Sequence, residues 1–336
     1  MDIAVVILNW NGKHFMEKYL PLLVANTSTV DGAFIAVADN GSTDGSVEWL
    51  KRVHPEVTLL EFDQNYGFAE GYNKAFASIE ADYYLLLNSD VEVPEGWLQP
   101  LVSFMEEHPE AGVCQPKILS EVDRTHFEYA GAAGGFLDSY GFPFCRGRIL
   151  SNIEEDHGQY DDPVECFWAT GACLMIRSSL YHHLNGFDSA FFAHMEEIDL
   201  CWRAKLLGYE VWCVPKSIIY HVGGGTLPND SPRKLFLNYR NNLLMLYKNL
   251  PSSKRNKIVR RRMFIDNLSA FVYLVTGRRK FWKSVRDAHS EFGKMKENLE
   301  VSPFSEEYND KGLYHGKIVL DFYISGKKLV FDKLRF

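Results

Sequence analysis

Short apolar runs alternate with longer amphipathic segments through the first ninety residues of the chain. Four runs are continuously apolar, as strands buried on both faces of a parallel sheet are, and they cover Ile3–Leu8, Phe34–Asp39, Thr58–Phe62 and Tyr83–Leu87. Helical spacing of apolar residues marks the segments between them, which are Phe15–Val24, Ser46–Val53 and Phe68–Ile79. This order predicts an α/β fold: an open, mostly parallel sheet with helices on both faces.

The pattern is less regular in the rest of the chain. Residues 110–230 are mixed and loop-rich, with strands expected at Cys173–Ile176 and Val211–Val214 and a helix at Ile198–Leu207. Another helix is expected at Arg233–Leu250, and the composition turns basic after Pro251. We therefore expect two parts: an α/β domain over residues 1–250 and a mainly helical C-terminal extension over residues 251–336.

Length and composition exclude several classes of protein. A chain of 336 residues can bury a sizeable core without disulfides or a structural metal. The six cysteines are scattered with no CxxC pair, which argues against a zinc module and a disulfide-stapled scaffold. No signal peptide is visible at the N-terminus, and no apolar run reaches the length of a spanning helix. We expect a cytoplasmic protein.

The charge is unevenly distributed. Residues 251–300 contain thirteen Lys and Arg against five Asp and Glu, a net charge of +8 within a chain of net charge −8. The other residues therefore carry −16, and this acidic body argues against a nucleic-acid partner. The basic stretch is the place where an anionic partner is electrostatically plausible.

Four polar segments follow the predicted strands, where open α/β sheets bind their ligands; they are Asn9–Gly12, Asp39–Asp44, Gln64–Gly67 and Asn88–Glu92. Asp39 is placed to accept hydrogen bonds from a nucleobase or ribose, although turn and helix-cap chemistry explains it equally well. Asp90 and Glu92 are spaced to meet one Mg²⁺ or Mn²⁺ ion, or they belong to a plain polar loop. GxGxxG, GxxxxGK[ST], HExxH and GxSxG motifs are absent, which argues against dehydrogenases, P-loop enzymes, zincins and α/β-hydrolases.

Further candidates lie in the second half of the chain. Glu196, Glu197 and Asp199 form an acidic cluster that offers a general base, or else an acidic first helical turn in which Asp199 pairs with Arg203. His221 precedes three glycines and is either a metal ligand or a structural histidine. Arg240, on the expected helix at Arg233–Leu250, is either a phosphate contact or an exposed helix charge.

These pieces form an ordered set of motifs: ILNWNG, VADNGSTDGS, NYGFAEGYN, LLLNSDVEV, TGACLMIR, FFAHMEEIDLCWR, HVGGGT and NYRNN. The set resembles the family 2 inverting glycosyltransferases with the GT-A fold, and among these the rhamnosyltransferase-like members that build bacterial surface polysaccharides. The resemblance covers about residues 1–250 and implies a GT-A-type, Rossmann-like mixed sheet. It does not cover the tail.

The resemblance also implies roles for individual residues. The donor nucleotide sugar, UDP- or dTDP-linked, is expected at Asn11, Asp39, Asn65, Gly67, Asn88, Asp90 and Arg240, and the Mg²⁺ or Mn²⁺ ion at Asp90, Glu92 and His221. Glu196 and Glu197 match the acidic pair whose second member is the catalytic base; the family usually has Asp there, so the base is to be sought among Glu196, Glu197 and Asp199. The implied reaction moves rhamnose or another hexose onto a hydroxyl of a glycan or lipid-linked acceptor, with inversion.

Two alternatives stay open at this point. A nucleotidyltransferase also combines an α/β sheet with acidic metal ligands, but it is expected to carry a glycine-rich, basic loop that Asn9–Gly12 lacks. A non-catalytic sugar-nucleotide or glycan-binding module has no need of the acidic cluster.

The tail allows two interpretations. Lys254–Arg262 and Arg278–Lys283 flank the apolar segment Phe264–Val275, and Phe281 and Trp282 interrupt the second basic cluster. This pattern suits peripheral contact with the inner face of the plasma membrane. A helical appendage that packs on the catalytic domain, or on another subunit of a homo-oligomer, explains it equally well.

Overall fold

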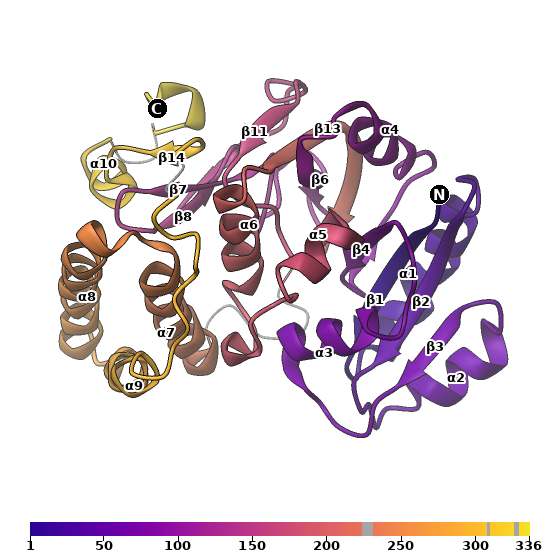
Figure 1. Cartoon of the computed structure of the whole chain (residues 1–336), viewed down its shortest axis with the longest axis horizontal. Helices are drawn as coiled ribbons and strands as arrows, with labels where there is room; N and C mark the ends of the chain where they lie inside the picture. The colour runs from indigo at the N-terminus through magenta and orange to yellow at the C-terminus, as the bar shows by residue number, and fades with distance from the viewer. Residues whose placement is uncertain (224–230, 308–309, 326–328) are drawn as a thin grey trace.

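A nine-stranded mixed sheet forms the centre of the molecule in a computed structural model that describes residues 1–223, 231–307, 310–325 and 329–336 (Figure 1). Its strands are β1 (Ile3–Asn9), β2 (Ala33–Asp39), β3 (Thr58–Glu61), β4 (Tyr83–Leu87), β5 (Val91–Glu92), β6 (Ala111–Ser120), β11 (Val164–Cys166), β12 (Cys173–Arg177) and β13 (Glu210–His221). The order is β11-β13-β6-β12-β4-β1-β2-β3, and β5 pairs with β13.

The register of the sheet places several strand ends side by side. β1 runs parallel to β2 and β4, with Asn9 opposite Asp39 and Ile7 opposite Leu87. β12 is antiparallel to β4 and starts with Cys173 opposite Leu87. The segments after β1, β2 and β4 therefore share one edge of the sheet, as the strand-end rule predicts.

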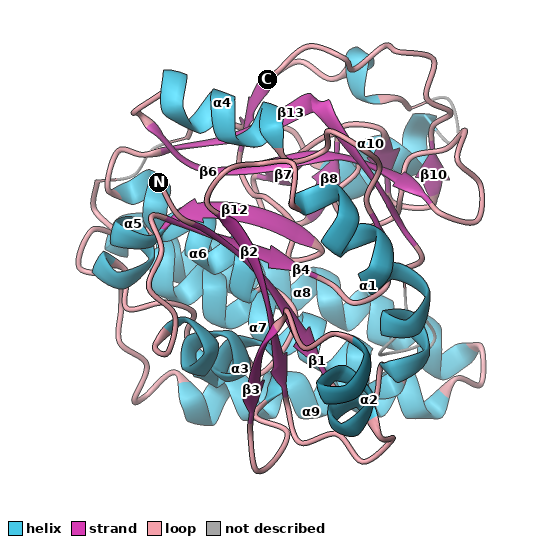
Figure 2. Cartoon of the chain, turned by 90° about the vertical axis from the view of Figure 1, so that its right-hand side faces the viewer, coloured by secondary structure: helices cyan, strands magenta, loops and turns pink. Residues whose placement is uncertain are grey.

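Helices cover both faces of this sheet (Figure 2). Ile3, Val5 and Ile7 of β1 belong to one apolar core, and Ala4 and Val6 belong to the other, because successive side chains of a strand point to opposite faces. The first core receives α1 (Lys13–Thr27), α2 (Ser46–Val53) and α4 (Gln99–Glu107). The second receives α3 (Gly67–Phe76), α5 (Ser178–His183), α6 (Glu196–Leu206) and α7 (Pro232–Asn249).

A second, five-stranded sheet lies in the part of the chain that gave no clear sequence pattern. Its order is β10-β9-β8-β7-β14, and its strands are β7 (Gly135–Asp138), β8 (Pro143–Cys145), β9 (Arg148–Ile149), β10 (Asn152–Ile153) and β14 (Leu313–Tyr314). β14 comes from the C-terminal extension and runs parallel to β7. The extension thus completes a sheet begun in the first 250 residues.

The rest of the extension is helical, as expected. It consists of α8 (Ser252–Val275), α9 (Arg279–Met295) and α10 (Ile318–Ser325), with α8 and α9 beside α7 (Figure 1). None of the helices in the described ranges combines the length and the hydropathy of a membrane-spanning segment. The structure contains the predicted mixed sheet, and the predicted helix Ser46–Val53 has the bounds of α2.

Candidate active site

The loops after β1 and β2 are joined by a network of short polar side chains. Asp39 is buried, and its carboxylate accepts hydrogen bonds from the Asn9 side-chain amide (2.8 Å) and from the backbone N–H of Ser42 (2.8 Å). Asn11, which has a positive φ of 53°, donates its backbone N–H to the Ser42 hydroxyl and accepts from the backbone N–H of Thr43. The network fixes Asn11 and Asp39 side by side at the edge of the sheet.

A second network fixes the start of α3. The side-chain amide of Asn40 donates to the Asn65 side chain (3.1 Å) and to the Gly67 carbonyl (3.0 Å), and its oxygen accepts from the backbone of Tyr66. Gly67 has a φ of +80°, and a Cβ there would lie 2.6 Å from the ring of Phe192. Glycine is therefore required where the 191–195 loop crosses the start of α3.

Asp90 and His221 meet at the end of β13. The His221 Nε2 lies 3.2 Å from an Asp90 carboxylate oxygen and 3.4 Å from the Asn88 side-chain nitrogen, and its Nδ1 lies 3.5 Å from Glu128. Burial lowers the pKa of His221, but hydrogen bonds with Asp90 and Glu128 outweigh that effect and raise the pKa to about 10. Asp90 and His221, far apart in sequence, are thus brought together as expected.

Glu92 lies apart from this pair. Its carboxylate is 2.8 Å from the guanidinium of Arg124, which stacks on the ring of Tyr220. This pairing gives Glu92 a surface role at β5 rather than a place beside Asp90.

Gly224, Gly225 and Thr226 of the glycine-rich motif lie outside the described residues.

The segment that leads into α6 has an unusual backbone. Phe192, His194 and Met195 have positive φ angles of 64°, 71° and 74°, a conformation that costs energy for residues other than glycine. The Phe192 carbonyl accepts hydrogen bonds from the backbone N–H groups of Phe68 (2.7 Å) and Ala69 (3.2 Å) in α3. This strained loop therefore rests on α3 and is held against the sheet edge.

Arg240 and Asn241 of α7 hold the same loop from the other side. The Asn241 side-chain amide donates to the carbonyls of Phe191 (2.9 Å), Ala193 (2.8 Å) and His194 (2.7 Å). Arg240 donates to the Ala190 and Phe191 carbonyls.

Arg240 is buried, and its other guanidinium nitrogens bind its neighbour Asn241 and Glu291 of α9. These contacts are structural, so the structure does not place Arg240 as a phosphate contact. The pair acts instead as a clamp on the loop.

Glu196 and Glu197 start α6 immediately after this loop. Burial raises the pKa of Glu197 to about 7, because its effect is larger than that of the backbone hydrogen bonds that lower the pKa. Burial and the neighbouring charge of Glu197 raise the pKa of Glu196 well above its usual value. One carboxylate oxygen of each residue is buried without a hydrogen-bond partner. A carboxylate with a pKa near 7 and a free oxygen is suited to general base catalysis.

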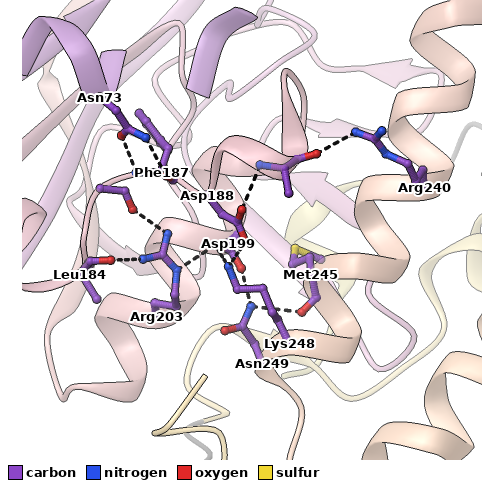
Figure 3. Close-up of polar contacts among 12 residues, drawn as sticks. Asn73, Leu184, Phe187, Asp188, Asp199, Arg203, Arg240, Met245, Lys248 and Asn249 are labelled. Atoms are coloured by element: carbon purple, nitrogen blue, oxygen red, sulfur yellow. Dashed lines mark hydrogen bonds and ion pairs between the residues drawn. The ribbon is translucent and has the colours of Figure 1, made fainter. Parts of the chain in front are cut away.

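Asp199 has a different environment (Figure 3). One of its oxygens accepts from Arg203 (2.8 Å) and Lys248 (3.1 Å), and the other accepts from Asn249 (2.8 Å). Burial raises the pKa of Asp199, but the charges of Lys248 and Arg203 outweigh it and lower the pKa below its usual value. A fully buried, paired carboxylate of this kind ties α6 to α7 and is not available as a base.

Lys234 acts electrostatically on one residue beside the Asp90–His221 pair and on one residue of the loop before α6. Lys234 lies near the start of α7. Burial lowers its pKa, and the nearby carboxylate of Glu128 offsets part of this effect. The charge of Lys234 also adds to the burial that lowers the pKa of His194 to about 4. The charge of Lys234 is thus felt both at Glu128, which contacts His221, and in the loop that precedes Glu196.

The residues at the sheet edge fit a divalent cation that is shared with a ligand. Asp90 and His221 are a carboxylate and a histidine side chain in contact, and the imidazole would bind Mn²⁺ or a related ion by giving up the proton that Asp90 and Glu128 now stabilise. No three His, Cys, Asp or Glu residues within the described ranges are grouped so that they would hold a metal ion on their own. Two side chains would leave coordination positions for oxygen ligands from outside the protein.

Sequence reasoning missed several residues of the site. Asn9, Asn40 and Glu128 contact the candidate residues Asp39, Asn65 and His221, and of these three only Glu128 lies outside the segments singled out by the strand-end rule. Glu128 lies in the irregular middle of the chain, where no motif marks it. Nothing in the sequence connects Lys234 with His194, because they lie on different segments of the chain. The effect of the Lys234 charge on His194 arises only when the chain folds.

The sequence match to known families decides what kind of protein carries this site. The model of the family described as "Glycosyl transferase family 2" matches residues 4–184, more than half of the chain. The chain belongs to glycosyl transferase family 2. This family 2 glycosyltransferase is therefore an enzyme of sugar transfer, and membership favours that activity over nucleotidyl transfer or non-catalytic binding.

Curated relatives of this family 2 glycosyltransferase include rhamnosyltransferases. It is 24% identical over 261 residues to N-acetylglucosaminyl-diphospho-decaprenol L-rhamnosyltransferase of Mycobacterium tuberculosis, a match that covers 73% of this chain and 83% of the relative. It is 26% identical over 212 residues to the rhamnosyltransferase WbbL of Escherichia coli, covering 60% and 78%. The similarity expected from the motifs is confirmed.

Solved structures agree on the fold. The S. aureus TarS 1-349 structure in complex with UDP-GlcNAc has a TM-score of 0.57 at 14% identity and covers 89% of this chain and 84% of that one. The mannosyltransferase PcManGT from Pyrobaculum calidifontis, in complex with GDP-Man and Mn²⁺, has a TM-score of 0.55 at 14% identity and covers 87% and 75%.

Proposed function

We propose that this glycosyltransferase moves rhamnose or another hexose from a nucleoside-diphosphate sugar to a hydroxyl of a glycan or lipid-linked acceptor, with inversion at the anomeric carbon. The observation that carries the proposal is Glu197, whose carboxylate has a pKa of about 7 and one buried oxygen without a partner, at the start of α6 directly after the loop that packs on α3. The names of the rhamnosyltransferase relatives support the sugar and the lipid-linked acceptor.

The donor site of this proposal is the edge of the sheet. Asp39 and Asn11 would bind the nucleoside of a UDP- or dTDP-linked donor, with Asn65 and Gly67 at the start of α3 beside it. Asp90 and His221, with Asn88 next to them, would hold Mg²⁺ or Mn²⁺ at the diphosphate. A bound divalent cation there neutralises negative charge on the leaving diphosphate. The Mn²⁺ in the solved mannosyltransferase complex supports this assignment.

Glu197 is the general base of the proposed reaction. Its carboxylate takes the proton of the acceptor hydroxyl, the oxygen attacks the anomeric carbon, and the bond to the diphosphate breaks on the opposite face. A single displacement of this kind inverts the configuration, and positioning supplies much of the rate. Glu196 has a pKa raised well above its usual value by burial and by the charge of Glu197, which favours its neutral form beside the base. Asp199 fixes α6 to α7 and takes no part in proton transfer.

The proposal also assigns catalysis to residues 1–250 and places the enzyme in the cytoplasm. Residues 1–250 contain the groups assigned to donor, cation and base, and residues 251–336 complete the fold around α7. The six buried cysteines are all free thiols, which is usual in a reducing compartment and supports a cytoplasmic location.

Release of nucleoside diphosphate by the purified chain tests the proposal. A panel of UDP-, dTDP- and GDP-linked sugars is incubated with Mg²⁺ or Mn²⁺ and acceptor lipids, and the product linkage is assigned by NMR. We expect Glu197→Gln to reduce transfer by about 10²–10⁴-fold, the usual contribution of a general base. Glu107→Gln is the control, because Glu107 is an exposed carboxylate at the end of α4, near the end of β13 opposite to His221.

Wild-type-like turnover of folded Glu197→Gln would remove this residue from the role of base. Release of pyrophosphate instead of nucleoside diphosphate would contradict sugar transfer itself.

A further inference from the structure

The outward face of α8 carries an apolar patch. We call it the α8 patch, and its members are Phe264, Leu268, Phe271, Val272 and Val275. Each exposes more than half of its surface, up to 65% for Phe264. Their spacing of four, seven, eight and eleven residues keeps them within about 120° of arc on a helix that turns 100° per residue. The opposite side of α8 faces the protein and buries Val259, Arg262, Asp266 and Ala270.

A second helix extends this apolar surface. Leu320, Tyr323 and Ile324 of α10 expose 51%, 77% and 75% of their surface. A groove of about 570 Å³ lies between the two helices, lined by Phe264 together with Leu320 and Tyr323. Figure 1 shows α8 and α10 at the end of the molecule opposite the first β-α units. Monomeric proteins rarely expose contiguous apolar surface of this kind without a binding role.

Basic residues border the α8 patch at both ends. Lys257, Arg260 and Arg261 precede it on the same exposed face, and Arg260 and Arg261 also line the groove. Arg279 and Lys280 follow it at the start of α9 and are exposed. These residues belong to the stretch of net charge +8, whereas the rest of the chain carries −16.

We propose that the α8 patch and α10 dock on the surface of an anionic phospholipid bilayer. The apolar side chains would enter the boundary between headgroups and acyl chains, and the basic residues at either end of the patch would meet the lipid phosphates. The acidic remainder of the protein is repelled by such a surface, so this end of the molecule is turned toward it.

Charge favours a bilayer over a second copy of the chain. A symmetric dimer would bring the same patch of both copies face to face, and with it two stretches of charge +8. Phe281 and Trp282 are not part of the docking surface, because both are partly buried, with Phe281 packed on Tyr273. The inference depends on neither the donor sugar nor the acceptor.

Flotation of the full-length chain with vesicles tests the proposal. We expect binding to vesicles of phosphatidylcholine mixed with phosphatidylglycerol, with much weaker binding to phosphatidylcholine alone and a decrease at high salt. Phe264→Ser combined with Phe271→Ser should lower binding by more than about tenfold, because two aromatic side chains that would enter the bilayer are lost. Val122→Ser, at a residue that is 80% exposed on another surface, is the matched control.

A second pair of variants separates charge from apolar contact. Arg260→Glu combined with Arg261→Glu should abolish the preference for anionic vesicles, while Arg52→Glu on α2 should leave it intact. Nucleoside-diphosphate release from donor in the absence of lipid should stay at the wild-type level in the α8 variants, because α8 lies far from the sheet edge.

Equal flotation of wild type and the Phe264→Ser, Phe271→Ser variant would overturn the proposal. A concentration-dependent dimer in sedimentation equilibrium without lipid, lost in that variant, would assign the surface to a second copy and would overturn it too.

Discussion

At the scale of single residues, three carboxylates close together in sequence acquire different chemistry from their neighbours. Glu196 is buried and Glu197 is half-buried, each with one buried oxygen that has no partner, whereas Asp199, about one turn later, is held by Arg203, Lys248 and Asn249. The sequence predicts the cluster and the Arg203 pairing at helical spacing. It does not predict Lys248 and Asn249, since these reach Asp199 only when α7 packs against α6.

The raised pKa of Glu197 predicts how the rate depends on pH. A general base acts as the carboxylate, and burial moves its pKa from the usual 4.5 to about 7. Activity should therefore rise as the pH increases through 7, and kcat/KM should fall about tenfold per unit below it. Transfer kinetics between pH 5.5 and pH 9, with saturating cation, provide the measurement. A flat profile between pH 5.5 and pH 7 would show that another group is the base.

The buried ion pairs of Asp199 predict an effect on stability. In Asp199→Asn, Arg203 loses the charge that compensates it in the interior and Lys248 keeps only its pair with Asp188, which should lower the free energy of unfolding by about 3–5 kcal/mol. Urea unfolding followed by circular dichroism measures the change. Glu61→Gln removes an exposed pair with Lys51 and should leave stability unchanged. Equal stability of both variants would show that the Asp199 network is dispensable.

At the scale of elements, the sequence predicts the first half of the molecule far better than the middle. α2 has the predicted bounds, and β4 does as well, because long apolar runs and amphipathic helices have clear periods. The second sheet was missed: its strands are two to four residues long, too short for a period-two pattern, and β14 reaches β7 from the far end of the chain. The clamp formed by Arg240 and Asn241 was likewise visible only as a pair of polar residues on a helix.

The clamp on the 191–195 loop predicts a loss of rate without loss of fold. Asn241→Ala removes three hydrogen bonds from a loop whose residues 192, 194 and 195 have strained positive φ angles. Glu197 follows this loop directly, and a shift of about 1 Å at a catalytic group costs on the order of 10²-fold in rate. We expect kcat to fall by about that factor while the donor KM changes little.

Asn238→Ala is the matched control for this prediction. Asn238 lies on the same helix, but its amide donates to the Lys234 carbonyl of α7 itself, so its loss should leave kcat near the wild-type value. Hydrogen exchange should increase in residues 189–197 of Asn241→Ala alone. Equal rates in the two variants would show that the loop keeps its conformation without the clamp.

At the scale of the whole molecule, residues 251–336 are both an integral part of the fold and the site of the basic charge. Glu291 of α9 is 2.6 Å from Arg240, and Arg262 of α8 donates to Asn242 of α7. β14 extends the second sheet, and the backbone of Ile318 donates to the buried carboxylate of Asp138. The two interpretations of the tail, packing and membrane contact, are therefore compatible, since one side of α8 faces the protein and the other faces outward.

Removal of these residues should disrupt the enzyme rather than release a smaller active one. A fragment of residues 1–250 would expose the apolar face of α7, leave Arg240 without Glu291 and open the edge of β7, so we expect it to aggregate or to unfold at a lower temperature than the full chain. Circular dichroism and size-exclusion chromatography of the fragment, alone and coexpressed with residues 251–336, measure this. Recovery on coexpression would show that noncovalent packing is sufficient, because the added segment supplies the missing surfaces. A fragment that folds and transfers sugar alone would instead establish residues 1–250 as an independent domain, and the clamp on the 191–195 loop would then have to hold without α9.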